Sequence, residues 1–422
     1  MRFRTGSWVA LSLGLFLFAQ AVSAAGTGDV SLSKEVERYI EKSASVDADP
    51  STFRVFWKDG LKFETGDGNF SMHIGGRLMW DSFWMSSDDF SSSDVDTTDG
   101  TFFRRVRLEV AGTAYKNTIF KVQVDFAKGN VVLKDVYMGL KKLGRAGTLK
   151  AGHFKEPFGL EELTSSKYMT FIERAQGFAP SRNSGIGVSN AAFDKRLFWA
   201  LGIFRTTNDQ GADRKDGGYA FTVRLAGIVV HDKERGLLVH VGVGFSFRDV
   251  DSVRYRFRPG PGTGDRSVDT GSIASDDVTL AGFELAAVWR SLSVQFELML
   301  ADVNTPGGSD PQFLAWYVQV SYFITGESRR YKKGSFGRVK PKKNFHDGGG
   351  GLGAWEVAVR FDTADLNDSG VTGGQQDLIT GGVNWHWNPN ARVMLNVVHA
   401  DVSGTSPSGT ITSVIVRFQF DF

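Results

Sequence analysis

Three arginines alternate with two aromatic residues in the run from Arg254 through Arg256 to Arg258. In an extended chain, alternate side chains point to opposite sides, so these arginines share one side at intervals of roughly 6.6 Å. A guanidinium stays charged at any physiological pH, and its planar set of donors matches two oxygens of one phosphate. The pattern therefore predicts a row of similar oxyanion sites. The alternative is a solvated basic strand on a surface loop.

Further charged candidates follow from the same alternation. Arg105 and Arg107 fall on one side of the predicted strand 102–112, and Asp135 shares a side with Tyr137. An arginine that faced lipid near the centre of a membrane would cost ~2–4 kcal/mol. If these strands cross a membrane, we therefore expect the charged side to face water.

The elements that must position these side chains alternate between apolar and polar residues from about residue 70 onward. The clearest stretches are 120–126, 237–247, 314–322 and 379–387. Several of them are about nine to thirteen residues long, which suits a tilted strand that crosses a membrane. Strands of soluble proteins run about five or six residues. A soluble β-sandwich that buries the same apolar face is the alternative.

The connections between these stretches alternate between short turns and long polar loops. Short turns are predicted at 115–117, 194–195, 290–291 and 388–390, and long loops at 86–101, 156–183, 206–217, 250–277, 302–311, 364–376 and 402–409. This alternation predicts an all-β fold, a transmembrane antiparallel β-barrel of about sixteen strands. The basic segment 326–351 stands where a short turn is expected, and its length has no explanation in the sequence.

The two ends of the chain predict export and membrane assembly. Basic residues, an apolar run and small residues occupy positions 1–24, as in a cleaved signal peptide; an N-terminal membrane anchor is the alternative. A helical pattern at 31–49 predicts a short periplasmic arm within a linker at 25–60, before a barrel at 61–422. The closing strand, which ends at Phe422, resembles the assembly signal of outer-membrane barrels.

Composition narrows the classes of function. The chain has no Cys and a net charge of +2, which excludes thiolate chemistry and gives no indication of a nucleic-acid partner. The seven His lack metal-binding spacing, the acidic loop near residue 94 breaks the EF-hand pattern, and the glycines at 348–351 lack a phosphate-loop Lys. We therefore expect no cofactor, no metal and no enzymatic activity.

Several motifs together make the chain resemble the phosphate-selective porin O and P family from about residue 60 to the end. They are GRLMWDSF, FFRRVRLEVAG, LKDVYMGL, GHFKEPFGLEELTSSKYMTFIERA, RYRFRP with VDTGSIASDD, GRVKPKKNF, GAWEVAVRFDTADLND, NWHWNPNARVMLNVVHADV and RFQFDF. The resemblance implies a homotrimer of sixteen-stranded barrels among the lipids of a Gram-negative outer membrane. It also implies a basic lumen that passes inorganic phosphate or other small anions.

The resemblance extends to individual residues. It places Arg254, Arg256 and Arg258 at the start of an arginine ladder, Arg104 and Arg105 near the constriction, Asp135 beside the anion site, and Lys155 and Lys167 in the constriction-loop motif. Alternation puts Arg105, rather than Arg104, on the lumen side. The sequence departs from the family at Pro259-Gly260-Pro261, which interrupts the ladder and puts selectivity for phosphate in doubt.

We therefore expect a passive porin for phosphate-like oxyanions. A less selective anion or solute porin is the first alternative. A closed structural barrel and a barrel lipid hydrolase are two others, although the sequence offers no convincing Ser–His pair for hydrolysis.

Overall fold

The computed structural model describes residues 52–88, 95–127, 129–214, 216–346, 348–406 and 408–422. The predicted signal peptide at 1–24 and the predicted helix at 31–49 lie outside these residues. The two described helices are short, η1 (Gly144–Ala146) and α3 (Leu160–Leu163). No helix in the described ranges has the length and apolar character needed to cross a membrane.

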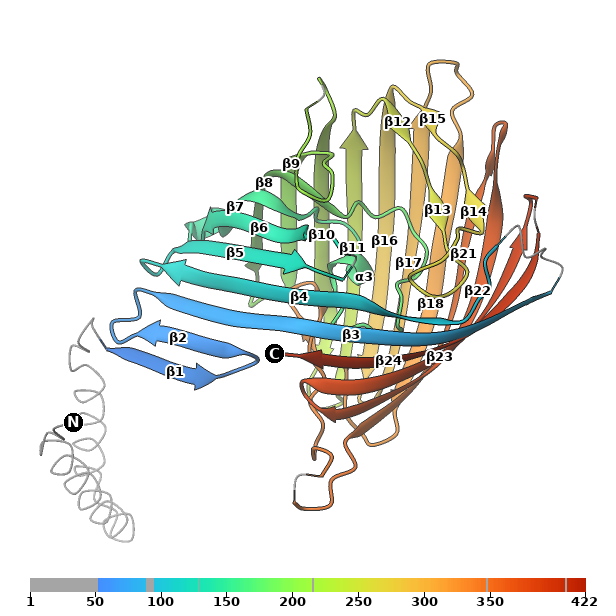
Figure 1. The fold of residues 1–422 in the computed structure, drawn as a ribbon. Helices are drawn as coiled ribbons and strands as arrows, with labels where there is room; N and C mark the ends of the chain where they lie inside the picture. The colour runs from blue at the N-terminus through green and yellow to red at the C-terminus, as the bar shows by residue number, and fades with distance from the viewer. Residues whose placement is uncertain (1–51, 89–94, 128, 215, 347, 407) are drawn as a thin grey trace, which may run out of the picture. The chain divides into compact units, whose positions relative to one another are not determined.

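Sixteen antiparallel strands form a closed barrel (Figure 1). The main sheet has eighteen strands, and two of them, β1 (Phe53–Trp57) and β2 (Leu61–Thr65), precede the barrel, which leaves sixteen. The wall strands are β3 (Ser71–Asp88), β4 (Gly100–Ala114), β5 (Thr118–Asp125), β6 (Val132–Leu140), β7 (Thr148–Lys155), β8 (Arg182–Ala192), β9 (Leu197–Arg205), β10 (Tyr219–Asp232), β11 (Leu237–Arg248), β16 (Asp277–Trp289), β17 (Leu292–Asn304), β18 (Gln312–Phe323), β21 (Ala354–Asp368), β22 (Val371–Asn388), β23 (Ala391–Ser403) and β24 (Gly409–Asp421). The last strand pairs with the first, so the barrel closes.

The wall has an apolar outer face and a polar inner face. On β11, Val243, Phe245 and Phe247 are 42–49% exposed, whereas the alternating Ser246 and Arg248 are buried inside the barrel. A soluble β-sandwich would bury the apolar face and expose the polar one. The distribution is the reverse, as in a membrane barrel around a polar lumen, so the sandwich alternative is wrong.

The alternation of short turns and long connections is confirmed, with one error. Residues 364–376 were expected to be a polar loop, but β21 continues to Asp368 and β22 begins at Val371. The two strands pair beyond the expected end of the wall, with Asn367 opposite Thr372. Polar residues therefore continue the hairpin here, and Gly370, at φ 86°, allows the tight turn.

Three connections fold into the barrel and position the candidate site. The inner loop (residues 156–181) joins β7 to β8 and contains α3. The arginine hairpin (residues 249–276) joins β11 to β16 and contains β12 (Ser252–Val253), β13 (Arg256–Phe257), β14 (Val268–Asp269) and β15 (Ile273–Ala274). The turn-side segment (residues 324–353) joins β18 to β21 and contains β19 (Tyr331–Lys332) and β20 (Ser335–Phe336).

Candidate functional site

The inner loop crosses the lumen and is fixed to the far wall. The Ile172 amide donates to Asn396 Oδ1 of β23 (2.8 Å), and Gln176 Nε2 donates to Asp362 Oδ1 of β21 (3.0 Å). Five residues before Ile172 in the loop, the Lys167 carbonyl accepts a hydrogen bond from Gln419 Nε2 of β24 (3.0 Å). These bonds hold the loop against β21–β24, and one open space lies between the other side of the loop and β3–β8.

A basic cavity of about 160 Å³ occupies that space, and we call it the constriction cavity. Its lining contains seven cationic side chains and one carboxylate, the latter from Asp135. The cations are Arg77, Arg105, Arg107, Lys121, Lys155, Arg174 and Arg182. Of the residues predicted from sequence, the structure therefore brings Arg105, Arg107, Asp135 and Lys155 together. Arg77 and Lys121 were missed, although Lys121 lies on the polar side of the predicted stretch 120–126.

Carboxylates neutralise part of this charge. Arg182 Nε donates to Asp135 Oδ1 (2.7 Å), Arg107 Nε donates to Asp125 Oδ2 (2.7 Å), and Lys155 Nζ lies 2.9 Å from Glu162 Oε1 of α3. The first pair joins β8 to β6 across β7, the second joins the neighbouring strands β4 and β5, and the third joins β7 to the inner loop. These pairs fix the shape of the cavity while leaving it with an excess of positive charge.

Arg105 differs from its neighbours because no carboxylate in the described residues pairs with it. It is 3% exposed, its Nη1 contacts Met79 Sδ at 3.5 Å, and its Nε has no hydrogen-bond partner within the described part of the chain. A buried guanidinium with unused donors is costly. An anion in the cavity would satisfy those donors.

A β-bulge places both Arg104 and Arg105 inside the barrel, whereas alternation along the sequence favoured Arg105 over Arg104 on the lumen side. Met79 of β3 pairs with Arg105 and Trp80 pairs with Phe103, so Arg104 is an extra residue in β4. A bulge of this kind disrupts the strict alternation of side chains. Consecutive arginines therefore reach two different cavities.

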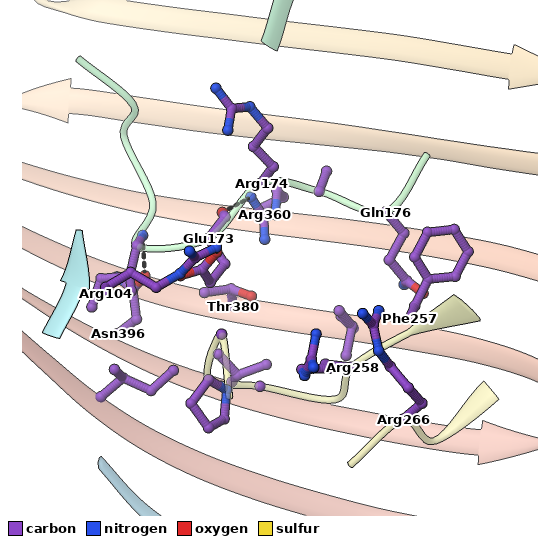
Figure 2. A pocket seen from close by; sticks show the side chains of 18 residues that line it. Arg104, Glu173, Arg174, Gln176, Phe257, Arg258, Arg266, Arg360, Thr380 and Asn396 are labelled. Atoms are coloured by element: carbon purple, nitrogen blue, oxygen red, sulfur yellow. Dashed lines mark hydrogen bonds and ion pairs between the residues drawn. The ribbon is translucent and has the colours of Figure 1, made fainter. Parts of the chain in front are cut away.

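Arg104 belongs to a second cavity of about 150 Å³, the upper cavity, which Figure 2 shows. Its Nε and Nη2 donate to the two carboxylate oxygens of Glu173 at 2.6 and 2.8 Å. Arg258, Arg266 and Arg360 also line this cavity. Burial and the nearby positive charge of Arg258 lower the pKa of Arg266 to about 10.

The arginine hairpin carries the ladder predicted from sequence, but it lies inside the barrel and is not part of the wall. Tyr255 packs on Phe178 of the inner loop and on Phe313 of β18, at ring-centroid distances of 4.8 and 5.7 Å. The arginines alternate with these aromatics as predicted. Arg254 forms a bidentate pair with Asp269 (2.7 and 2.6 Å), whereas the exposed Arg256 side chain pairs with none of the described residues.

The Pro259-Gly260-Pro261 interruption lies at the tip of this hairpin. Beyond the tip the chain returns, and Arg266 on the returning segment lines the upper cavity together with Arg258. Arg266 Nη1 donates to the Arg256 carbonyl (2.9 Å), which ties the two segments together. The row of arginines therefore continues across the turn, a relation that spacing along the chain does not reveal.

Shared lining residues place the three cavities next to one another. A third cavity of about 340 Å³ contains Arg254 and Arg256, and it shares Phe257 and Arg266 with the upper cavity. Arg174 lines both the upper cavity and the constriction cavity. Cationic side chains therefore border all three spaces.

Lys167 lies apart from the constriction cavity. Its Nζ is 3.7 Å from Asp421 Oδ2 near the end of β24, and it lines a separate small space with Arg338 and Arg392. The structure therefore does not bring Lys167 together with Lys155. In the described part of the chain, no cluster of three or more His, Cys, Asp or Glu side chains could hold a metal ion.

Comparisons with known proteins give consistent results. Porin O of Pseudomonas aeruginosa is 27% identical over 427 residues, which cover 90% of this chain and 95% of that protein. An uncharacterised protein of Caulobacter vibrioides is 29% identical over 84% of this chain and 73% of its own length.

Solved structures share the fold. An anion-selective porin from Comamonas acidovorans aligns with a TM-score of 0.52 at 12% identity, over 84% of this chain and 100% of that one. The outer-membrane channel DcaP of Acinetobacter baumannii aligns with a TM-score of 0.53 at 12% identity, over 83% and 98%. The family model described as phosphate-selective porin O and P matches residues 73–422. The chain therefore belongs to the phosphate-selective porin O and P family, whose members are outer-membrane channels rather than enzymes.

Proposed function

We propose that the barrel passes anions by diffusion along its row of arginines and favours phosphate-like oxyanions at the constriction cavity. One observation carries the proposal: seven cationic side chains and a single carboxylate line the narrow space between the inner loop and β3–β8. An anion 4 Å from one cation gains about 4 kcal/mol at the effective dielectric of a partly wet site. Several such cations offset the loss of the anion's water.

The groups in the constriction cavity also favour phosphate over a halide. Arginine donors match two phosphate oxygens at once. Protonated phosphate carries O–H donors, and Asp135 and the hydroxyls of Ser165 and Ser166 line the same cavity as acceptors. Chloride has no donor for these groups. This assignment agrees with the roles that the family resemblance gave to Arg105 and Asp135.

The row of arginines supports transport rather than tight binding. Arg256 and Arg258 on the hairpin, Arg266 and Arg104 in the upper cavity, and Arg105 in the constriction cavity offer similar groups in successive spaces. An anion can leave one site because the next is equivalent. We include Lys155 and Arg107 as residues that shape the constriction cavity, and Lys167 as a cation of the separate space near β24.

Finer features of the protein belong to the same proposal. We propose that residues 1–24 are removed as a signal peptide, that residues 25–60 form a periplasmic arm, and that the barrels assemble as homotrimers among outer-membrane lipids. The N-terminal sequence of the purified protein, together with its mass on native gels before and after heating, tests these features. A retained leader or a monomer in mild detergent would contradict the corresponding one.

Reversal potentials across planar bilayers test the transport proposal. We expect a steady conductance and an anion-selective reversal potential in gradients of potassium chloride and of potassium phosphate. Arg256→Glu should lower the anion-to-cation permeability ratio at least two-fold. Arg235→Glu is the matched control, since Arg235 lies in the turn between β10 and β11 with its side chain 81% exposed. A wild-type channel without anion preference would overturn the proposal.

A further inference from the structure

The side loop (residues 206–214 and 216–218), which joins β9 to β10, lies against the outside of the wall. Ser184 Oγ of β8 donates to the Gly211 carbonyl of this loop (2.8 Å). Ser184 shares a face of β8 with Ile186, two residues further along the strand, and Ile186 is 58% exposed. Because Ser184 points outward, the loop that contacts it covers part of the outward face.

Three rows of outward side chains cross β7–β10 at and below the side loop. The first row is polar and consists of His153, Ser184, Arg205 and Tyr219. The second row has only apolar residues, Ala151, Ile186, Ile203 and Phe221. The third row is also apolar, with Leu149, Val188, Leu201 and Val223. The outward face therefore changes from polar to apolar with distance from the loop.

A groove of about 770 Å³ runs down this face from the side loop. The groove is hollow partly because Ala151 presents only a methyl group between the larger side chains of Met138 and Ile186. From Ser184 at the loop to Val188 it covers four residues of β8, or roughly 13 Å along the strand. It therefore has a polar upper end and a long apolar floor.

The groove faces the outer leaflet of the membrane. The side loop is one of the long connections, and in barrels of this kind long loops are extracellular while short turns are periplasmic. Its polar residues Asn208, Asp209 and Gln210 belong at the level of the lipid headgroups, since the hydrocarbon offers them no partners. The roughly 13 Å below the loop compares with about 15 Å for half of the hydrocarbon core. The groove thus matches the depth of one leaflet.

We propose that this groove holds one acyl chain of lipid A, the phosphorylated glycolipid of the outer leaflet. The sugar and phosphate groups of the lipid lie beside Tyr219 and Arg205, whose Nε also donates to Asp213 Oδ2 of the side loop (2.9 Å). A tyrosine is typical of the level where tails meet headgroups. Because lipid tails are as apolar as the groove, retention depends on close packing along the floor and on polar contacts at the upper end. This site is independent of the ion that passes through the lumen.

Filling the floor of the groove tests the proposal. Ala151→Phe places an aromatic ring there. Ala281→Phe is the matched control, because Ala281 of β16 lies outside the groove, between the outward-facing Phe245 and Leu300. The full-length barrel is refolded in detergent with equal amounts of lipid A and phosphatidylethanolamine, and native mass spectrometry counts the lipids that each chain retains. We expect one lipid A per wild-type chain, at least three-fold lower occupancy in Ala151→Phe, and no change in the control.

Two further variants act at the two ends of the groove. Val188→Trp narrows the lower end and should also reduce retention of lipid A, which keeps the test available if Ala151→Phe does not fold. Arg205→Gln removes the charge at the upper end and should lower the preference for lipid A over phosphatidylethanolamine at least two-fold. Heat-modifiable gel mobility identifies folded barrels. Single-channel conductance should stay unchanged in folded Ala151→Phe, because Ala151 faces away from the lumen.

Each remaining outcome contradicts the proposal. Equal retention of lipid A by the wild type and both groove-filling variants would show that the groove holds no lipid. An equal loss in Ala281→Phe would show that retention does not depend on this site. Equal retention of phosphatidylethanolamine by the wild type would overturn the assignment to lipid A. Dissociation of an oligomer in Ala151→Phe without loss of lipid would mean that a second copy of the chain occupies the groove.

Discussion

The two halves of the lumen use buried charge differently. Along β3–β8, seven cations and one carboxylate line an open cavity. Along β10–β17, Arg224 forms a bidentate pair with Glu284 (2.7 and 2.5 Å), also donates to Gly334, and is 1% exposed. An arginine whose donors the protein satisfies holds structure together. An arginine left short of partners, such as Arg105, is available to an anion.

The comparison has an energetic basis. Removing one partner of a buried ion pair leaves the other charge uncompensated and costs about 3–5 kcal/mol. Removing an unpaired buried cation relieves its own desolvation and the repulsion from its neighbours. Stability and selectivity should therefore respond to different arginines.

The largest expected effect is the loss of stability on breaking the Arg224–Glu284 pair. Glu284→Ala should lower the free energy of unfolding by about 3–5 kcal/mol, measured by urea unfolding of barrels refolded in detergent. The double variant Arg224→Met with Glu284→Leu should recover much of this loss, because neither charge is then left alone. If Glu284→Ala unfolds like the wild type, the pair does not hold this half together.

Arg105→Ala should change the selectivity of the channel more than its stability. We expect the anion-to-cation permeability ratio to fall about five-fold, which corresponds to a change of roughly 1 kcal/mol in the barrier for the anion. The free energy of unfolding should fall by less than in Glu284→Ala, because no buried carboxylate loses its partner. Arg105→Lys, which keeps the charge but not the planar donors, should keep the preference for anions over cations and lose the preference for phosphate over chloride. A stability loss as large as that of Glu284→Ala would erase the contrast between the halves.

Glu173→Gln tests whether Arg104, which is now paired with a carboxylate, can be made available to an anion. Burial alone would raise the pKa of Glu173, but the charge and hydrogen bonds of Arg104 more than offset this and hold the pKa well below its usual range. The uncharged amide should leave Arg104 free to bind anions. Phosphate should then block the chloride current about two-fold more strongly, which corresponds to roughly 0.4 kcal/mol. Unchanged block would mean that Arg104 does not contact the passing ion.

The same pair predicts how the channel responds to acid. Since the folded pKa of Glu173 lies below that of the unfolded chain, its stabilising contribution is complete above about pH 4.3. The contribution is lost only as the pH falls through the lower folded value. Reversal potentials in chloride should therefore be flat from pH 7 to pH 4.5. A transition within that range that Glu173→Gln abolishes would show that Glu173 titrates normally.

The smallest effect is expected at Arg254. Asp269 already neutralises it, and its side chain is 49% exposed, so Arg254→Gln should change the permeability ratio by less than about 1.5-fold, which is under 0.3 kcal/mol. Arg256→Gln should change it more, because Arg256 lies two residues further along the same ladder and has no carboxylate partner in the described chain. Equal effects of the two substitutions would show that pairing with a carboxylate does not determine how much each arginine contributes to anion selectivity.

Local patterns in the sequence predicted the barrel well, because most wall strands alternate between apolar and polar residues and short turns join them in pairs. The same alternation found Arg105, Arg107 and Asp135. It failed at Arg104, since the bulge becomes evident only when the partner residues Met79 and Trp80 are known. It also gave no account of residues 326–351, because their contacts with α3 and with β10 join residues more than 100 positions apart.

The hydrogen bond from the Ile324 amide to the Trp355 carbonyl (2.9 Å) makes the turn-side segment a removable cassette. Its two ends meet beside each other on adjacent strands, so its length and composition can change without altering the register of the wall. Insertions and deletions at this site therefore offer a way to alter the bore of such channels during evolution. For protein engineering, the same junction is a place to exchange one interior lining for another.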